Sequence, residues 1–186
     1  MCTLCARVEA VRFVQMLSWN GVKMDMRGFA AGAAGTIALD VYTYADMAVR
    51  ARPASDVPAR VVQLLAQKAH FPSFASEDGD EPKNRRSGAS ALMGYGVGLG
   101  AAVAYAEIRP AFRAWLPWPI AGLLLGAATL IVSEGSATRL GATDWSKWSA
   151  SDWVSDIVPR SLYGLVTAFF CEHLCKAGSS GGGNGA

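Results

Sequence analysis

Two long stretches without charged residues dominate the hydrophobic pattern of this chain. Residues 87–106 and residues 114–133 each contain twenty positions with no Asp, Glu, Lys or Arg. At 1.5 Å of rise per residue, a helix of this length crosses a hydrocarbon core of roughly 30 Å. The seven residues between them, 107–113, carry three charges and a proline. The pattern therefore predicts a transmembrane helical hairpin.

Two weaker apolar segments on either side of this hairpin extend the prediction to four spans. Both contain charges, including Asp40 in the first and Arg160 in the last, but five of the six tryptophans lie beside expected span ends, as at membrane interfaces. The alternative is a soluble all-α bundle, although soluble helices of this length normally show a charged face. We therefore expect an all-α, multi-pass four-helix bundle in the cell inner membrane, occupying residues 28–175. The expected spans are residues 28–49, 87–108, 115–137 and 153–174.

The first loop of this bundle is expected to contain an amphipathic helix. Residues 55–68 carry an apolar face suited to the membrane surface or to the end of the bundle. Ser55 can cap this helix, and Pro58 fits its first turn. The charged residues that follow, 76–86, predict a flexible loop.

The two ends of the chain are expected to lie outside the bundle. Residues 1–27 form an N-terminal extension with an amphipathic candidate, and Met24 or Met26 offers an alternative start just before the first span. Residues 176–186 are rich in Gly and Ser, which predicts a disordered tail.

Small residues recur at four-residue spacing within the expected spans, which places them in ridges where two helix backbones can approach closely. The second span has the most glycines and is expected to pack at the centre of the bundle. The pairs are Gly28 and Gly32, Gly96 and Gly100, and Gly122 and Gly126.

The first and third spans also resemble each other. In both, a Gly-Ala-Ala sequence, beginning at Gly32 or Gly126, is followed by an acidic residue eight positions after the glycine, at Asp40 or Glu134. This similarity predicts two repeated transmembrane hairpins. Chance similarity between two Gly- and Ala-rich helices is the alternative.

Composition and charge exclude several classes of protein. Charged residues make up 17% of the chain, against about 25% in an average soluble domain. The formal net charge of +2 is too small to indicate a nucleic-acid partner. Ten basic residues lie on the side of the large loop and seven on the side of the termini, which favours a cytoplasmic loop.

Asp40 is the clearest candidate for a functional residue. It lies near the expected middle of the bilayer, where an unpaired carboxylate is costly, so it must be neutral, paired or directed away from lipid. It is a candidate ion or ligand site together with Thr36, one turn earlier, and Glu134. The alternative is a protonated or hydrogen-bonded carboxyl group that holds helices together.

The other acidic residues near span ends are expected to form ion pairs. Each has a basic residue nearby in sequence. The expected pairs are Glu134 with Arg139, Glu107 with Arg109, Glu172 with Lys176, and Asp156 with Arg160.

The sequence gives little indication of metal binding or catalysis. Cys171, His173 and Cys175 are the weak metal-ligand candidates, with Cys2 and Cys5 on the same expected side, and we expect no metal site. The chain contains no Ser–His–Asp set, histidine box or phosphate-binding loop, so we expect no enzyme activity and identify no cofactor.

The order of motifs resembles that of small uncharacterised bacterial inner-membrane proteins grouped as domains of unknown function. The resemblance rests on Gly-Phe-Ala-Ala-Gly-Ala-Ala-Gly-Thr at residues 28–36, Arg-x-Arg-Pro at residues 50–53 and the glycine-rich second span. It implies a four-helix membrane fold and no established activity.

We expect a structural or accessory subunit that binds the lipid bilayer and other membrane subunits or a second copy of itself. The alternative is a small transporter or channel component that uses Asp40 as a proton or cation site.

Overall fold

The computed structural model describes residues 19–76 and 79–179, and all regular structure in these ranges is helical. This confirms the all-α prediction. Two of the helices, α5 and α6, are long and apolar enough to cross a membrane. The elements are α2 (Trp19–Arg50), α3 (Val57–Lys68), α4 (Pro72–Ala75), α5 (Asp80–Phe112), α6 (Trp118–Leu140), the 3₁₀ turn η1 (Trp145–Lys147) and α7 (Ala150–Ser179).

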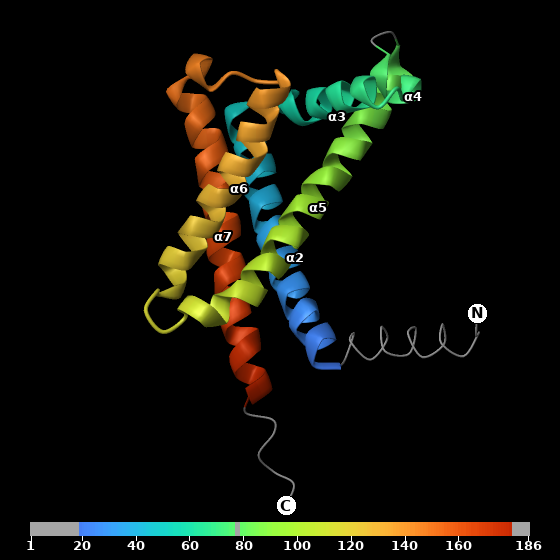
Figure 1. Cartoon of the computed structure of the whole chain (residues 1–186). Helices are drawn as coiled ribbons and strands as arrows, with labels where there is room; N and C mark the ends of the chain where they lie inside the picture. The colour runs from blue at the N-terminus through green and yellow to red at the C-terminus, as the bar shows by residue number, and fades with distance from the viewer. Residues whose placement is uncertain (1–18, 77–78, 180–186) are drawn as a thin grey trace, which may run out of the picture.

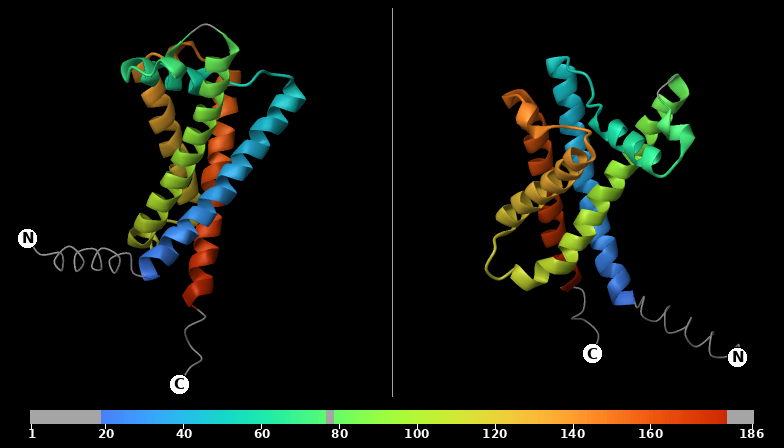
Figure 2. Two further views of the ribbon diagram at one scale, coloured as in Figure 1. Left: turned by 90° about the vertical axis from the view of Figure 1, so that its right-hand side faces the viewer. Right: turned by 45° about the horizontal axis from the view of Figure 1, so that its top comes forward.

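The four long helices alternate in direction and pack mainly in the order α5, α2, α7, α6, which we call the row, and α5 runs obliquely across it (Figure 1). Helix α5 packs against α2, α2 packs against α7, and α7 packs against α6. Helices α5 and α6 touch little, because they diverge from the short connection that joins them (Figure 2). The central pair is therefore α2 and α7, while α5 and α6 form the two outer sides of the row.

This arrangement corrects the expectation that the glycine-rich second span lies at the centre. A Cβ atom added at Gly96 or Gly100 would meet no atom within 4 Å outside its own helix. Gly98, at a different angle around α5, faces α2, where an added Cβ would lie 2.7 Å from the Thr36 hydroxyl. The glycines of α5 therefore point in two directions, and only one direction is packed.

The other expected glycine ridges lie between helices. Added Cβ atoms at Gly28 and Gly32 would lie 3.0 Å and 2.6 Å from the Cβ atoms of Ala106 and Ala102 on α5. In the second hairpin, an added Cβ at Gly122 would lie 2.7 Å from the carbonyl oxygen of Gly164, and one at Gly126 would overlap the carbonyl oxygen of Arg160. Both hairpins therefore use two glycines, four residues apart, to bring their helices together.

Helices α2, α5 and α7 are longer than the expected spans, whereas α6 has the expected length and is shifted by three residues. Residues 80–86 form the first two turns of α5 instead of a flexible loop, since Asp80 and Glu81 carry negative charge at the positive end of the helix dipole. Helix α7 begins at Ala150, before the expected position, because Ser149 and Asp152 cap its first turn. Helix α6 ends at Gly141, whose φ of 79° belongs to the left-handed region that glycine adopts without strain.

The expected amphipathic helix is α3, which lies across one end of the row (Figure 1). Its Val61 packs in a small core with Ala137 and Ala142, which come from the end of α6 and the residues that follow it. Pro58 occupies the first turn as expected, but the capping position belongs to Asp56, and Ser55 accepts only a long bond of 3.4 Å from the Val57 amide. Helix α3 therefore closes the end of the bundle.

Candidate functional site

Asp40 interacts with a neutral partner near the middle of the row. Its carboxylate accepts a hydrogen bond of 2.9 Å from the Tyr95 hydroxyl, which links α2 to α5. Thr36 does not join this pair: its hydroxyl donates to the carbonyl oxygen of Gly32 at 2.8 Å, and it lies buried against α5. Asp40 bonds to Tyr95, whereas Glu134 pairs with Arg160, and within the described residues no hydrogen bond or ion pair joins the three candidates to one another.

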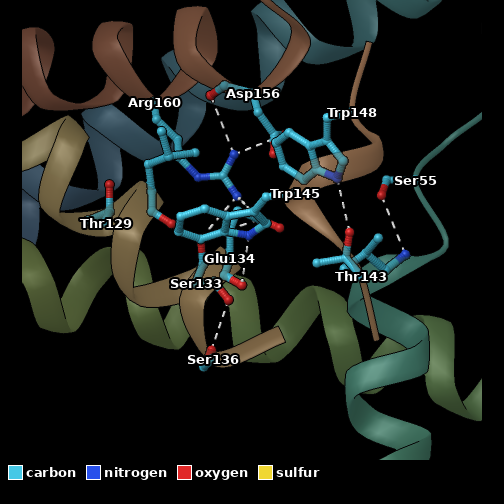
Figure 3. Close-up of polar contacts among 12 residues, drawn as sticks. Ser55, Thr129, Ser133, Glu134, Ser136, Thr143, Trp145, Trp148, Asp156 and Arg160 are labelled. Carbon is cyan, nitrogen blue, oxygen red and sulfur yellow. Dashed lines mark hydrogen bonds and ion pairs between the residues drawn. The ribbon is translucent and has the colours of Figure 1, made fainter. Parts of the chain in front are cut away.

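Glu134 lies in a buried ion pair between α6 and α7. Its carboxylate is 2.6 Å from Nη2 of Arg160, and Nη1 of the same guanidinium is 2.9 Å from Asp156. The Glu134 side chain is 10% exposed and that of Arg160 is 18% exposed. Figure 3 shows the guanidinium between the two carboxylates, with Trp145 beside it. The Trp145 indole donates to the carbonyl oxygen of Glu134 at 3.1 Å and thereby covers the pair.

A second buried ion cluster joins α5 to α7 at the opposite end of the row. Arg109 donates from Nε and Nη2 to one oxygen of Glu172, at 2.9 Å and 2.8 Å. Arg113 donates to the other oxygen at 2.6 Å. The guanidinium of Arg109 also lies over the Phe112 ring, 5.2 Å from its centroid. Glu172 and Arg109 are both almost fully buried, so the Glu172 carboxylate neutralises the buried positive charge of Arg109.

A third polar cluster ties the end of α2 to the start of α7. Asp46 accepts bidentate hydrogen bonds of 2.6 Å from Arg50, and Arg52 adds a third of the same length. Arg50 continues to the hydroxyl groups of Ser151 and Ser155 on α7. The spacing of four residues between Asp46 and Arg50 is a sequence signal for a local ion pair that sequence reasoning missed. The contacts of Arg50 with Ser151 and Ser155 span about a hundred residues and have no such signal.

Of the four expected ion pairs, one is correct and two are wrong. Asp156 and Arg160 pair as expected, one helical turn apart. Glu134 does not pair with Arg139, because residues five apart lie on different faces of a helix. Glu107 is exposed, and Arg109, its expected partner, binds Glu172 instead. The fourth expected pair joins Glu172 to Lys176, whose side chain lies outside the described part of the chain, and Glu172 binds Arg109 and Arg113.

The weak metal-ligand candidates do not converge. Cys171 is buried in the hydrophobic core with Tyr105, whereas His173 is exposed and hydrogen-bonds the carbonyl oxygen of Phe169 at 2.8 Å. Within residues 19–76 and 79–179, no group of three or more His, Cys, Asp or Glu residues is arranged to hold a metal ion. Cys2, Cys5 and the side chain of Cys175 lie outside the described part of the chain.

Among the residues that the structure describes, three buried side-chain polar atoms are without a hydrogen-bond partner. They are the Tyr105 hydroxyl, Nη1 of Arg109 and the Thr167 hydroxyl. Such atoms are rare, because burial without a partner costs about 1–3 kcal/mol. Two of the three belong to the end of the row that holds Glu172.

Comparison with known proteins adds no further assignment to these clusters. No family model, curated protein or solved structure matches the chain. The candidate sites therefore rest on geometry, and the resemblance to small bacterial membrane proteins stays a prediction.

Proposed function

We propose that the chain is an integral membrane protein whose four long helices all cross the bilayer. The surface of the row supports this: Ile131 and Val132 on α6 and Val41 on α2 are 60%, 65% and 64% exposed. Only 17% of the most apolar window of α5 and 28% of that of α6 is buried, which argues against core helices of a soluble protein.

The arrangement of the row extends this proposal to α2 and α7, which carry more charge. Both helices lie between α5 and α6. If α5 and α6 cross a membrane, then α2 and α7, which pack between them, lie in the same bilayer. On α7, Arg160 is paired with Glu134 and Glu172 with Arg109, and on α2 the Asp40 carboxylate is hydrogen-bonded to the neutral Tyr95. Pairing of this kind is what intramembrane charges require.

Within the membrane, the proposed role is that of a structural or accessory subunit. The outer face of α5, formed by Gly96, Gly100 and Ala104, carries this proposal. All three residues are exposed on the side of α5 that no other helix covers. Small residues at this spacing allow a second helix to approach closely in lipid. The proposed occupant is a helix of another membrane subunit or of a second copy.

Adding bulk to this face tests the role. We expect Gly96→Leu and Gly100→Leu to release co-purifying chains, or to dissociate a homo-oligomer, in native mass spectrometry from mild detergent. Gly94→Leu is the matched control, since Gly94 is also open on the same helix but lies two residues from Gly96 and therefore on another face. A lone monomer in every mild detergent, or complexes that survive both substitutions, would contradict the proposal.

The pairing of Asp40 with Tyr95 favours one alternative role, that of a proton or cation transporter component. The partner of this carboxylate is neutral, unlike the partners of Glu134 and Glu172. Asp40→Asn should abolish a proton or cation flux in liposomes if Asp40 carries it. An unchanged flux, or no flux in the wild-type protein, removes this alternative.

A further inference from the structure

We propose that Arg109, Arg113 and Tyr105 form a binding site for a phosphate group at the end of the row where α5 ends. This site goes beyond the proposed role as a subunit, because it takes a small anionic group and not a helix.

The charges of the cluster do not balance. Two guanidinium groups share the one carboxylate of Glu172. Arginine stays protonated in proteins, so the cluster carries one unit of positive charge. The nearest acidic residue in sequence, Glu107, is exposed on another face of α5 and does not contact the cluster. A single anion completes the neutralisation.

The hydrogen-bond donors of the cluster are also in excess. Arg109 uses Nε and Nη2 for Glu172, and its Nη1 is buried without a partner. The Tyr105 hydroxyl, one helical turn earlier on the same face of α5, is buried without a partner as well. Arg109 is 5% exposed and Tyr105 is 4% exposed, so solvent does not satisfy these donors. An oxyanion supplies several acceptors at once and fits such a set of donors.

Access and depth fit a phosphate group. The Arg113 side chain is 41% exposed, so it presents donors to the surface, whereas Arg109 and Tyr105 supply buried donors. The neighbouring Trp115 is 72% exposed, as expected for an aromatic side chain at headgroup depth. The phosphate comes either from a phospholipid headgroup or from free phosphate, and both use the same donors.

Thermal unfolding of the full chain in detergent micelles separates these two sources. One arm titrates dioleoylphosphatidylglycerol against dioleoylphosphatidylcholine, whose ammonium group compensates its phosphate. The other arm adds inorganic phosphate to lipid-free micelles, against chloride at the same ionic strength. We expect a saturable rise in the unfolding midpoint in at least one arm, because a ligand that binds only the folded state stabilises it. A rise in the lipid arm alone identifies a headgroup, and a rise with inorganic phosphate identifies a free anion. No saturable rise in either arm overturns the proposal.

Three variants decide whether this cluster is the site. Arg113→Gln should weaken the apparent affinity at least tenfold, and Arg139→Gln, an exposed arginine at the other end of the row, should leave it unchanged. Tyr105→Phe removes only the unpartnered hydroxyl, so we expect a ligand-free protein at least as stable as wild type and a several-fold weaker ligand effect. This variant keeps the test valid if Arg113→Gln fails to fold. Wild-type affinity in either of the two site variants would overturn the proposal.

Discussion

At Gly164 the backbones of α6 and α7 come into direct contact. An added Cβ atom would overlap the carbonyl oxygen of Gly122 and lie 2.7 Å from the backbone nitrogen of Gly126. Backbone atoms on both sides of the contact belong to helices and move only with the whole helix. The identity of this one residue therefore sets the distance between two helices.

Gly164→Ala is expected to destabilise the bundle by about 1–3 kcal/mol, the usual cost of excess volume in a packed interior. Gly94→Ala is the control: it adds the same methyl group in open space, away from the proposed docking face, and should stabilise the chain by about 0.5–1 kcal/mol through helix propensity. Chemical denaturation in detergent measures both values. Equal effects of the two substitutions would show that α6 and α7 are not this close.

The two partners of the buried pair between α6 and α7 are expected to respond differently to mutation. Arg160→Met leaves the buried Glu134 with only a long contact of 3.4 Å to Ser133, so it should cost about 3–5 kcal/mol. Glu134→Gln should cost less, because Arg160 keeps Asp156 as a partner. Unfolding free energies from denaturation measure both costs, with exposed Arg139→Met expected within about 0.5 kcal/mol of wild type. The reverse order would contradict the geometry of Figure 3.

At the scale of the element, the sequence predicts that each long helix exists. It does not predict which neighbouring helix covers each of its faces. The absence of charge over residues 87–106 predicts most of α5, but the charges of residues 80–86 conceal its first turns. Four-residue spacing shows that Gly96 and Gly100 share a helix face. It does not show whether a neighbour covers that face. The neighbour is decided by long-range packing of α2 against α7, which no local pattern encodes.

The start of α7 carries a reciprocal cap that makes its stability dependent on pH. The amide and hydroxyl of Ser149 donate to the Asp152 carboxylate at 2.8 Å and 2.7 Å, and the Ser149 hydroxyl accepts from the Asp152 amide at 3.3 Å. The hydrogen bonds from Ser149 lower the pKa of Asp152. A carboxyl group with a lowered folded-state pKa stabilises the fold above its unfolded value, near 3.9. That contribution is lost as the pH falls toward the folded-state pKa.

Ser149→Ala is therefore expected to cost about 1 kcal/mol at neutral pH, the typical loss for a helix cap. The difference from wild type should shrink as the pH falls below about 4 and approaches the lowered folded-state pKa of Asp152. Thermal unfolding in detergent from pH 7 to pH 3 measures it, and Ser136→Ala on the exposed surface of α6 is the control. A difference that stays constant over this range would mean that Asp152 does not act through Ser149.

At the scale of the whole molecule, the alternating directions of the helices fix which segments share an end of the row. Helix α4 lies at one end, and the connection between α5 and α6 lies at the other (Figure 1). The sequence predicts this alternation, since four successive spans place the first and second connections on opposite sides. The sequence does not predict that α5 and α6 diverge, because their divergence depends on how α2 and α7 pack between them.

If all four helices cross the membrane, Ser73 on α4 and Ala114 in the α5–α6 connection face opposite compartments. Both residues are exposed, so each can be replaced by Cys and labelled with a maleimide that does not cross membranes. The background replaces Cys2, Cys5 and Cys175 by Ser and keeps the buried Cys171. We expect Ala114→Cys to react in intact cells and Ser73→Cys to react only after permeabilisation, because ten of the basic residues lie on the side of α4 against seven on the other. The reversed result would overturn the orientation alone. Reaction of both residues from the same side would overturn the four-span arrangement, because an odd number of crossings must separate α4 from this connection.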